Sequence, residues 1–247
     1  MLDRAPFELS PRLLSLTEWI PDRSRVADIG GDHANLLIYL AKSGCLAYGI
    51  VGELNQGPFE NARRRIRDAG VQDFVEVRLG DGLSVLERNE VDVIVIAGMG
   101  GSLICQILSD NMEKLDGVKR LILQPNIGGQ NVRRWLKEHG FCLAGELLVE
   151  DTGILYEALA AEPGEETVYE EIGELPEEIL LEMGPLLWKN RHPLLKWKVE
   201  QIWSAKQRIY YGLQQAKSPT AIDKRVALEM ELKEWGRVKQ CLCTDLI

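Results

Sequence analysis

The sequence predicts an α/β protein whose larger part is a doubly wound, mostly parallel β-sheet and whose C-terminal part is an antiparallel helical hairpin. Three observations carry this prediction. Short β-branched runs alternate with helical patterns up to residue 160, two further β-rich stretches are joined tightly, and the C-terminal residues carry apolar stripes at helical spacing. Alternation indicates parallel strands, because a parallel connection needs a crossover helix, whereas a tight joint indicates an antiparallel pair.

The predicted elements follow one another in a regular order. The second helical pattern opens near Pro58 and ends at Gly70, the usual placement of proline and glycine at helix ends. The run at 91–98 is apolar nearly throughout, as suits a central strand covered on both faces. We expect strands at 25–30, 46–53, 74–82, 91–98 and 120–126, helices at 33–44, 57–70 and 130–140, and a reversed edge pair at 141–153 and 154–162. This order resembles the Rossmann-like arrangement of class I methyltransferases.

A change of periodicity near residue 163 divides the chain into two predicted domains, 1–163 and 164–247. After a charge-rich stretch, apolar residues recur in alternating steps of four and three, both before and after a break at Ser218 and Pro219. Two such helices joined by a short turn form a coiled-coil-like hairpin. The first stripe comprises Leu195, Val199, Ile202, Ile209, Leu213 and Ala216, with Lys206 at its one polar position.

Composition and charge are those of an ordinary globular protein. The chain has 45% hydrophobic residues and a formal net charge of −9. This negative charge argues against binding of nucleic acid over the whole surface, but it is compatible with binding through a local basic patch. The N-terminal residues lack the pattern of a signal peptide, and no apolar run has the length of a membrane span, so we expect a cytoplasmic protein. The five cysteines lack paired zinc-site spacing, and we expect no metal site.

The stretch DIGGDHANL, residues 28–36, joins the first predicted strand to the first predicted helix. In an open α/β sheet this edge is where ligands bind. Gly30 and Gly31 allow the backbone to approach a ligand, and Asp28 or Asp32 can meet its amine. The alternative is a tight turn that binds nothing, because small residues mark many such turns.

Acidic residues also end the next two predicted strands. Glu53 lies about 20 residues after the glycine turn, where a carboxylate can accept hydrogen bonds from the two hydroxyls of a ribose. Asp81, followed by Gly82, ends the third strand, where it can meet an adenine amino group. Each acid alone is more typical of a helix cap or a solvated charge. Together they predict a nucleoside-containing ligand.

The glycine turn distinguishes between two such ligands. The pyrophosphate of NAD favours the pattern G-x-G-x-x-G, whereas this turn reads G-G-D-H-A-N and places Asp32 where an anion would be repelled. S-adenosylmethionine has no phosphate, and its ammonium and sulfonium charges suit acidic residues. The sequence therefore favours S-adenosylmethionine as the cofactor.

Five segments together resemble the bacterial tRNA (adenine-22-N1)-methyltransferase family: DIGGDHANL, GELNQGPFENA, GDGL, VIVIAGMGGSLI and RLILQPN. The match runs in order from residue 8 to residue 160, and the family also carries a C-terminal hairpin. The resemblance implies transfer of a methyl group from S-adenosylmethionine to N1 of an adenine in the D-arm region of tRNA. The chain departs from the family's usual DIGSDHAYLP at Gly31, Asn35 and Leu37, which affects the shape of the pocket more than the identity of the cofactor.

The AGMGG segment, residues 97–101, follows the fourth strand, where many adenine N-methyltransferases carry a polar residue before two prolines that holds the exocyclic amine. Its absence suits a ring-nitrogen target, because adenine N1 has an available lone pair and needs no strong base. Catalysis then depends on alignment in a site without water, after the base has left its stack. We expect catalytic contacts from His33, Met99, Gln124 and Asn126, and further cofactor contacts from His33, Ala97, Gly98 and Met99.

Simpler roles remain open for several of these residues. Gln124 and Asn126 also suit a turn that ends a strand. His33 also suits a helix N-terminal residue that bonds local backbone, and we assign it no role as a general base.

Two stretches offer the positive surface that tRNA binding needs. Basic residues cluster on the predicted helix 57–70, and residues 186–217 carry many basic side chains with interleaved aromatics. A solvated helix face would usually mix both signs of charge, so we favour RNA contact. The expected RNA-binding residues are Arg63, Arg64, Lys189, Arg191, Lys196, Lys198 and Lys206.

Three functions are therefore compatible with the sequence. The first is a tRNA adenine-N1 methyltransferase that acts as a monomer or weak dimer and binds neither membrane nor metal. The second is a methyltransferase for a small molecule or protein, without a steep salt dependence in tRNA binding. The third is a non-catalytic RNA-binding module on a methyltransferase fold, which the acids at the predicted cofactor site disfavour.

Overall fold

The computed structural model describes residues 8–173, 175–214 and 218–244. The predicted stripe position Ala216 lies outside these residues, and the side chains of Asp32, Cys243 and Thr244 are likewise not described. The chain divides into two compact units, Met1–Val168 and Tyr169–Ile247. The predicted domain boundary, residue 163, is the last residue of the final strand.

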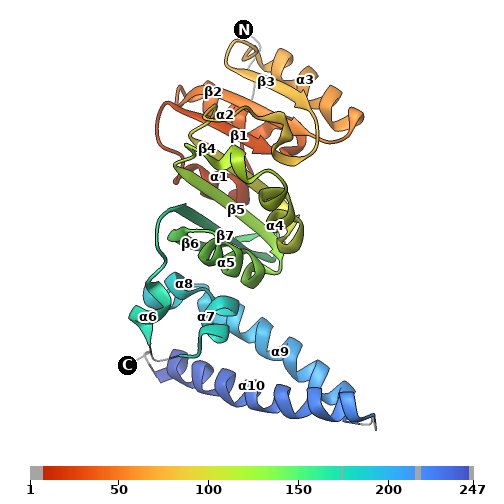
Figure 1. Ribbon diagram of the computed structural model, residues 1–247, viewed down its shortest axis with the longest axis vertical. Helices are drawn as coiled ribbons and strands as arrows, with labels where there is room; N and C mark the ends of the chain where they lie inside the picture. The colour runs from red at the N-terminus through yellow and green to blue at the C-terminus, as the bar shows by residue number, and fades with distance from the viewer. Residues whose placement is uncertain (1–7, 174, 215–217, 245–247) are drawn as a thin grey trace. The chain divides into compact units, whose positions relative to one another are not determined.

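The first unit contains one seven-stranded sheet in the order β3-β2-β1-β4-β5-β7-β6 (Figure 1). Strands β1 to β5 are parallel, and β7 pairs antiparallel with both β5 and β6. The predicted α/β class, the doubly wound sheet and its reversed edge pair are confirmed. The strands are β1 (Ser24–Ile29), β2 (Leu46–Glu53), β3 (Val75–Leu79), β4 (Val93–Gly100), β5 (Arg120–Ile127), β6 (Phe141–Asp151) and β7 (Ile154–Pro163).

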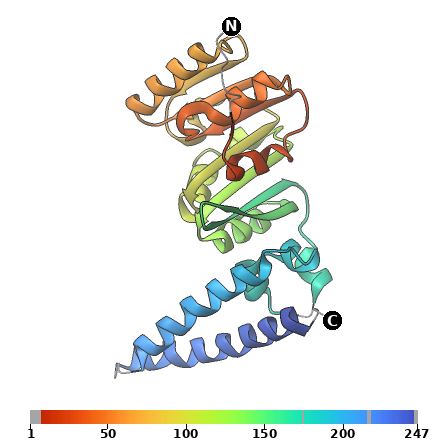
Figure 2. The ribbon, with the colours of Figure 1, turned by 180° about the vertical axis from the view of Figure 1, so that it is seen from behind.

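Both faces of this sheet are buried. Along β4, Val93 and Val95 belong to one apolar cluster, while Ile94 and Ile96 belong to the other. This alternation follows from the two-residue period of a strand, and it explains why β4 reads as an uninterrupted apolar run. Helices α1 and α2 lie on one face, toward the viewer in Figure 2, and α4 and α5 lie on the opposite face, toward the viewer in Figure 1.

The helices of the first unit include two that were not predicted from the sequence, α1 and α4. Helix α1 begins after Ser10, whose hydroxyl accepts a hydrogen bond from the Leu13 N–H, and Pro11 occupies its first position. The α-helices are α1 (Pro11–Thr17), α2 (Asn35–Lys42), α3 (Gln56–Ala69), α4 (Gly101–Asp110) and α5 (Gly129–Glu138), and the short 3-10 helices are η1 (Asp32–Ala34), η2 (Gly82–Val85) and η3 (Met112–Leu115).

In the residues that the structure describes, the regular elements of the second unit are helices. Its two long members, α9 (Leu195–Leu213) and α10 (Pro219–Thr244), run antiparallel to each other (Figure 1), as the stripes predicted. Trp235 is fully buried, and the Lys239 ammonium lies 5.0 Å from the centre of the Trp203 ring. Ile209, predicted in the stripe, is 57% exposed instead. Three short helices precede the hairpin: α6 (Val168–Ile172), which begins at the last residue of the first unit, α7 (Glu177–Met183) and α8 (Pro185–Lys189).

Across the described ranges, none of the helices combines the length and the apolar character that crossing a membrane requires.

Candidate active site

A cavity of about 310 Å³ opens at the carboxyl ends of β1 and β4. These strands are neighbours in the sheet, yet the chain leaves β1 toward β2 on one side and continues from β4 toward β5 on the other. Such a switch point leaves a crevice where ligands of doubly wound sheets bind. The cavity is lined by residues from α1, from the glycine turn after β1 and from the end of β4, among them Arg12, Asp28, Gly30, Asn35, Ala97 and Met99.

Two carboxylates from neighbouring strands are buried beside this cavity. Asp28 on β1 is 5% exposed and Glu53 at the end of β2 is 6% exposed. Burial, reinforced by the charge of Glu53, raises the pKa of Asp28 to about 7, and the Arg12 guanidinium opposes this rise. A cationic ligand would remove much of the electrostatic cost of ionising Asp28. The acids therefore fit a cofactor with an ammonium and a sulfonium charge.

The glycine turn is shaped by side chains that leave no room for a Cβ atom. Gly30 has φ +68°, and a Cβ there would overlap the Cε of Met99. A Cβ at Gly31 would overlap the carboxylate of Asp28 in its present rotamer. Glycine at both positions therefore lets Met99 and Asp28 occupy the floor of the cavity.

Helix α3 supports the next residues of the turn. His33 and Ala34 are both left-handed, with φ values of 69° and 56°, a conformation that costs roughly 1–2 kcal/mol for each residue with a Cβ. The His33 Nδ1 contacts the Asn61 side-chain amide, and the Arg65 guanidinium donates a hydrogen bond of 2.7 Å to Asn35 Oδ1. His33 therefore contacts a side chain of α3, whereas its simpler role implied a bond to local backbone, and its expected contact with the cofactor stays a prediction.

The AGMGG and LQPN segments form one hydrogen-bonded unit. Opposite Pro125, which has no N–H to donate, the register between β4 and β5 shifts and Gly98 bulges out with φ +78°. The side-chain amides of the residues on either side of the proline form the hydrogen bonds to β4 that the backbone does not make here. Gln124 Oε1 accepts from the Gly98 N–H at 3.0 Å, and Asn126 Nδ2 donates to the Gly98 carbonyl at 2.7 Å.

The two amides differ in access to a ligand. Gln124 is 0% exposed, and its oxygen already accepts two hydrogen bonds, so it reaches the site through the Gly98 peptide. Asn126 is exposed and lies at the surface of the bulge. Both side-chain amides were expected to bond the edge of a base. The position of Asn126 supports this expectation, whereas the position of Gln124 does not.

Two further residues at this edge were not predicted from the sequence. Arg12 lines the cavity and donates to Gln124 Oε1 at 2.6 Å, and its guanidinium carbon lies 5.2 Å from the centre of the Tyr156 ring. Ile127, the last residue of β5, is 76% exposed beside Gly100. No local pattern marks Arg12, since 112 residues separate it from Gln124. Ile127 could have been found from the sequence, because it is an apolar residue that directly follows the LQPN segment.

The third acidic residue lies beyond the end of β3, because this strand ends at Leu79 and does not extend to residue 82 as predicted. Asp81 follows β3 and is the N-terminal cap residue of η2, with an exposed side chain. Gly82 has φ +52° and lies against Ile107. The expected contact of Asp32 with the cofactor remains a prediction, because its side chain is not described.

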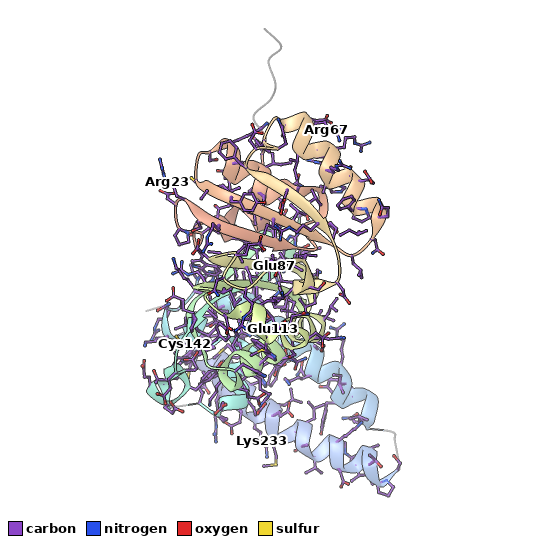
Figure 3. The ribbon with its side chains drawn as sticks, turned by 45° about the horizontal axis from the view of Figure 1, so that its top comes forward. Arg23, Arg67, Glu87, Glu113, Cys142 and Lys233 are labelled. Atoms are coloured by element: carbon purple, nitrogen blue, oxygen red, sulfur yellow. The ribbon has the colours of Figure 1, made fainter. Side chains whose placement is uncertain are left out.

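Several of the predicted RNA-binding residues are exposed. On α3, Arg63 and Arg64 are exposed, as is their neighbour Arg67, which is labelled in Figure 3. In the second unit, three more basic side chains are exposed, one on α8, one after α8 and one on α9. The exposed residues are Arg63, Arg64, Lys189, Arg191 and Lys196.

The other predicted RNA-binding lysines differ in their surroundings: Lys198 and Lys206 are withdrawn from solvent, which argues against RNA contact, whereas contact by Lys189 stays a prediction. Lys198 is 8% exposed and belongs to the buried face of α9. The Lys206 ammonium lies between Glu182 and Glu231 at 2.9 and 2.8 Å, and Lys189 is exposed but pairs with an acid of α6. The sign pattern of the sequence missed this, because the neutralising acids come from other helices.

Among the described residues, no group of three or more histidine, cysteine or acidic side chains is placed to hold a metal ion.

The doubly wound sheet with a reversed edge pair, a glycine turn without the phosphate fingerprint and buried acids at the switch point together define a Rossmann-like methyltransferase. The particular family follows from a match over residues 26–234 to the family model described as tRNA (adenine(22)-N(1))-methyltransferase. The chain belongs to this family. The resemblance inferred from its five segments is confirmed.

Individual relatives agree with this assignment. The tRNA (adenine(22)-N(1))-methyltransferase of Bacillus subtilis is 40% identical over 210 residues, which cover 85% of this chain and 87% of the relative. The crystal structure of the B. subtilis m1A22 tRNA methyltransferase TrmK superimposes with a TM-score of 0.88 at 36% identity, covering 94% of this chain and 99% of that one. A Streptococcus pneumoniae protein solved in complex with S-adenosyl-L-methionine gives a TM-score of 0.80 at 31% identity, with coverages of 94% and 100%.

Proposed function

We propose how this site carries out the reaction of the family to which the chain belongs, the transfer of a methyl group from S-adenosylmethionine to N1 of adenine 22 in tRNA. The observation that carries the activity is the family match over residues 26–234. The residue roles rest on the geometry of the cavity at the ends of β1 and β4.

The acids at the strand ends hold the cofactor. Asp28, at the floor of the cavity, pairs with the ammonium group, and the adjacent Glu53 accepts hydrogen bonds from the ribose hydroxyls. Asp81, at the exposed end of β3, bonds the adenine amino group. Ala97 and Met99 contact the cofactor from the end of β4.

The bulge at Gly98 receives the target adenine. Gly98 is exposed and has no side chain, so a flat base can lie against its peptide, and Asn126 is near enough to the bulge to bond the base edge. Met99 and Ile127 offer apolar contact to the faces of the base. Gln124 acts from beneath, by fixing the Gly98 N–H.

The bound cofactor supplies an electrophilic methyl group: the N1–carbon bond forms as the carbon–sulfur bond breaks, sulfur keeps the electron pair, and the positive charge moves to the adenine ring. No proton has to leave N1, so the chain needs no general base. Its residues hold nitrogen, carbon and sulfur in line and exclude water. The buried carboxylate of Asp28 keeps the cavity favourable for positive charge throughout.

The tRNA is bound by exposed basic side chains of both units. Arg63 and Arg64 on α3, together with Arg191 and Lys196 of the second unit, are placed to neutralise phosphates. We assign catalysis to residues 1–163 and tRNA binding mainly to residues 164–247. The protein acts in the cytoplasm, where tRNA is modified, as a monomer or weak dimer.

The test is incubation with unmodified bacterial tRNA and methyl-labelled S-adenosylmethionine, followed by nucleoside analysis and mapping. We expect 1-methyladenosine at position 22 and no transfer to a matched transcript with guanine at that position. Binding of the cofactor without transfer to tRNA would direct the search to a small-molecule or protein acceptor. Binding of tRNA without any turnover would indicate a non-catalytic module.

A further inference from the structure

Helix α1 lies outside the residues that the family model matches, yet it contributes a side chain to the candidate active site. Arg12, in the first turn of α1, lines the cavity and donates from Nη1 to Gln124 Oε1 at 2.6 Å. The Tyr156 ring, 5.2 Å from the guanidinium carbon, holds the cation from β7. Arg12 therefore joins α1, β5 and β7 at the edge where β4 ends.

The contact with Gln124 has a specific consequence for the amide. Gln124 Oε1 accepts from Arg12 and also from the Gly98 N–H at 3.0 Å. If the amide turned over, its NH₂ group would face two donors, so the pair of donors selects one orientation. The guanidinium bond is charge-assisted and is the stronger of the two. Without Arg12, the buried side-chain amide of Gln124 is held mainly by its hydrogen bond to the Gly98 N–H. That is the same peptide whose position Gln124 has to fix.

Arg12 also limits the shape of the bulge directly. A Cβ at Gly98 would lie 3.2 Å from Arg12 Nη1, so the guanidinium packs against the glycine. The Gly98 peptide is therefore fixed at its N–H by Gln124, at its carbonyl by Asn126, and above by Arg12.

We propose that Arg12 is a positioning residue for methyl transfer, acting through Gln124 to hold the Gly98 bulge in the geometry that receives the target adenine. The proposal rests on the proposed function, which places the adenine on this bulge. It assigns α1 a part in the reaction, because a shift of the bulge by a fraction of an ångström misaligns N1 with the methyl carbon.

The test is a double-mutant cycle between Arg12→Ala and Gln124→Met, read by single-turnover methylation of tRNA. At about pH 9, where Asp28 is ionised with or without the opposing charge of Arg12, we expect Arg12→Ala to slow the methyl-transfer step about 10- to 100-fold. The Kd for S-adenosylmethionine and the KM for tRNA should change less than about threefold at that pH. In the Gln124→Met background the same change costs less than about threefold, because the two residues act through one contact. Arg12→Lys, which keeps a cationic donor, recovers part of the rate.

The matched control is Arg88→Ala, which removes an exposed arginine paired with Asp116 away from the cavity and leaves the rate unchanged. An equal loss from Arg12→Ala in both backgrounds would overturn the proposal. A loss confined to the cofactor Kd or to the tRNA KM would also overturn it, since Arg12 would then be a direct binding residue.

A second measurement does not depend on activity. Amide hydrogen exchange in residues 97–101 of the ligand-free protein should quicken at least about tenfold in Arg12→Ala and in Gln124→Met, and remain unchanged in Arg88→Ala. Unchanged exchange in Arg12→Ala refutes the positioning role. If the wild type makes no 1-methyladenosine, the proposed function fails, and the exchange data still decide whether Arg12 holds the bulge.

Discussion

Cofactor binding should depend on pH through the buried carboxyl group of Asp28. Burial and the charge of Glu53 raise the pKa of Asp28 from 3.8 to about 7 in the ligand-free protein. Below that pH most molecules carry a neutral Asp28, whereas a ligand with a fixed sulfonium charge and an ammonium group prefers the carboxylate. Binding at acidic pH therefore requires release of a proton, and the affinity for S-adenosylmethionine should fall as the pH falls through 7.

The size of the effect follows from the fraction of ionised Asp28. With a pKa of about 7, this fraction drops about 25-fold between pH 7.5 and pH 5.5, and the apparent Kd rises by the same factor if only the carboxylate binds. Calorimetry at both pH values, repeated in buffers of different ionisation enthalpy, measures the Kd and the number of protons released. We expect nearly one proton released per cofactor at pH 5.5.

Two variants serve as controls for this experiment. Asp28→Asn should bind weakly and lose most of the pH dependence. Glu53→Gln removes the neighbouring charge, so the midpoint of the pH dependence should move to lower pH. A wild-type Kd that stays constant from pH 7.5 to 5.5, with no proton released, would refute the assignment of Asp28 as the ammonium partner.

The remaining predictions concern the ribose site, stability and tRNA binding. Glu53→Ala should weaken S-adenosylmethionine binding about 10- to 100-fold by removing the ribose contact, with circular dichroism unchanged; an unchanged Kd by calorimetry contradicts the ribose placement. The raised pKa of Asp28 means that between pH 4 and pH 7 the folded state holds a proton that the unfolded state has released. The free energy of unfolding of the ligand-free protein should therefore fall as the pH rises from 4 toward 7, by an amount on the order of 3–4 kcal/mol. Thermal melts of Asp28→Asn should lose most of this pH dependence. Neutralising Arg191 and Lys196 together should weaken tRNA binding. The slope of the logarithm of the tRNA binding constant against the logarithm of the salt concentration should become shallower by about one for each phosphate that is no longer neutralised. Lys206→Ala should lower the melting temperature and leave this slope unchanged.

Local patterns predicted the strands of the first unit well. The apolar run of β4 and the glycine at the end of α3 are signals carried by neighbouring residues, so each is readable without knowing the fold. Helix α1 was missed because only Leu16 and its close neighbours bury an apolar face in seven residues, too few for a periodic pattern. Helix α4 was missed although it contains an apolar stripe, because its start is fused to the glycines that end β4.

The sequence predicted the acidic residues of the candidate site, but not the hydrogen bonds and ion pairs between its residues. Asp28 and Glu53 could be placed because each ends a strand, and the carboxyl ends of parallel strands meet at one edge. The hydrogen bonds of Gln124 depend on the pairing of β4 with β5 and on Arg12, which is 112 residues away along the chain. The ion pairs of Lys206 likewise depend on acids from two other helices.

The sequence by itself determined the α/β class, the reversed edge pair, the helical hairpin, the acids at three strand ends and the family. These depend on residue type and on spacing along the chain, which the sequence carries in full. Only the tertiary structure decided that Arg12 meets Gln124, that Gln124 holds the Gly98 peptide from beneath, and that Lys198 is buried. The physical reason is that burial and hydrogen-bond partnership are properties of neighbours in space, and here those neighbours are brought together by the pairing of strands and the packing of helices.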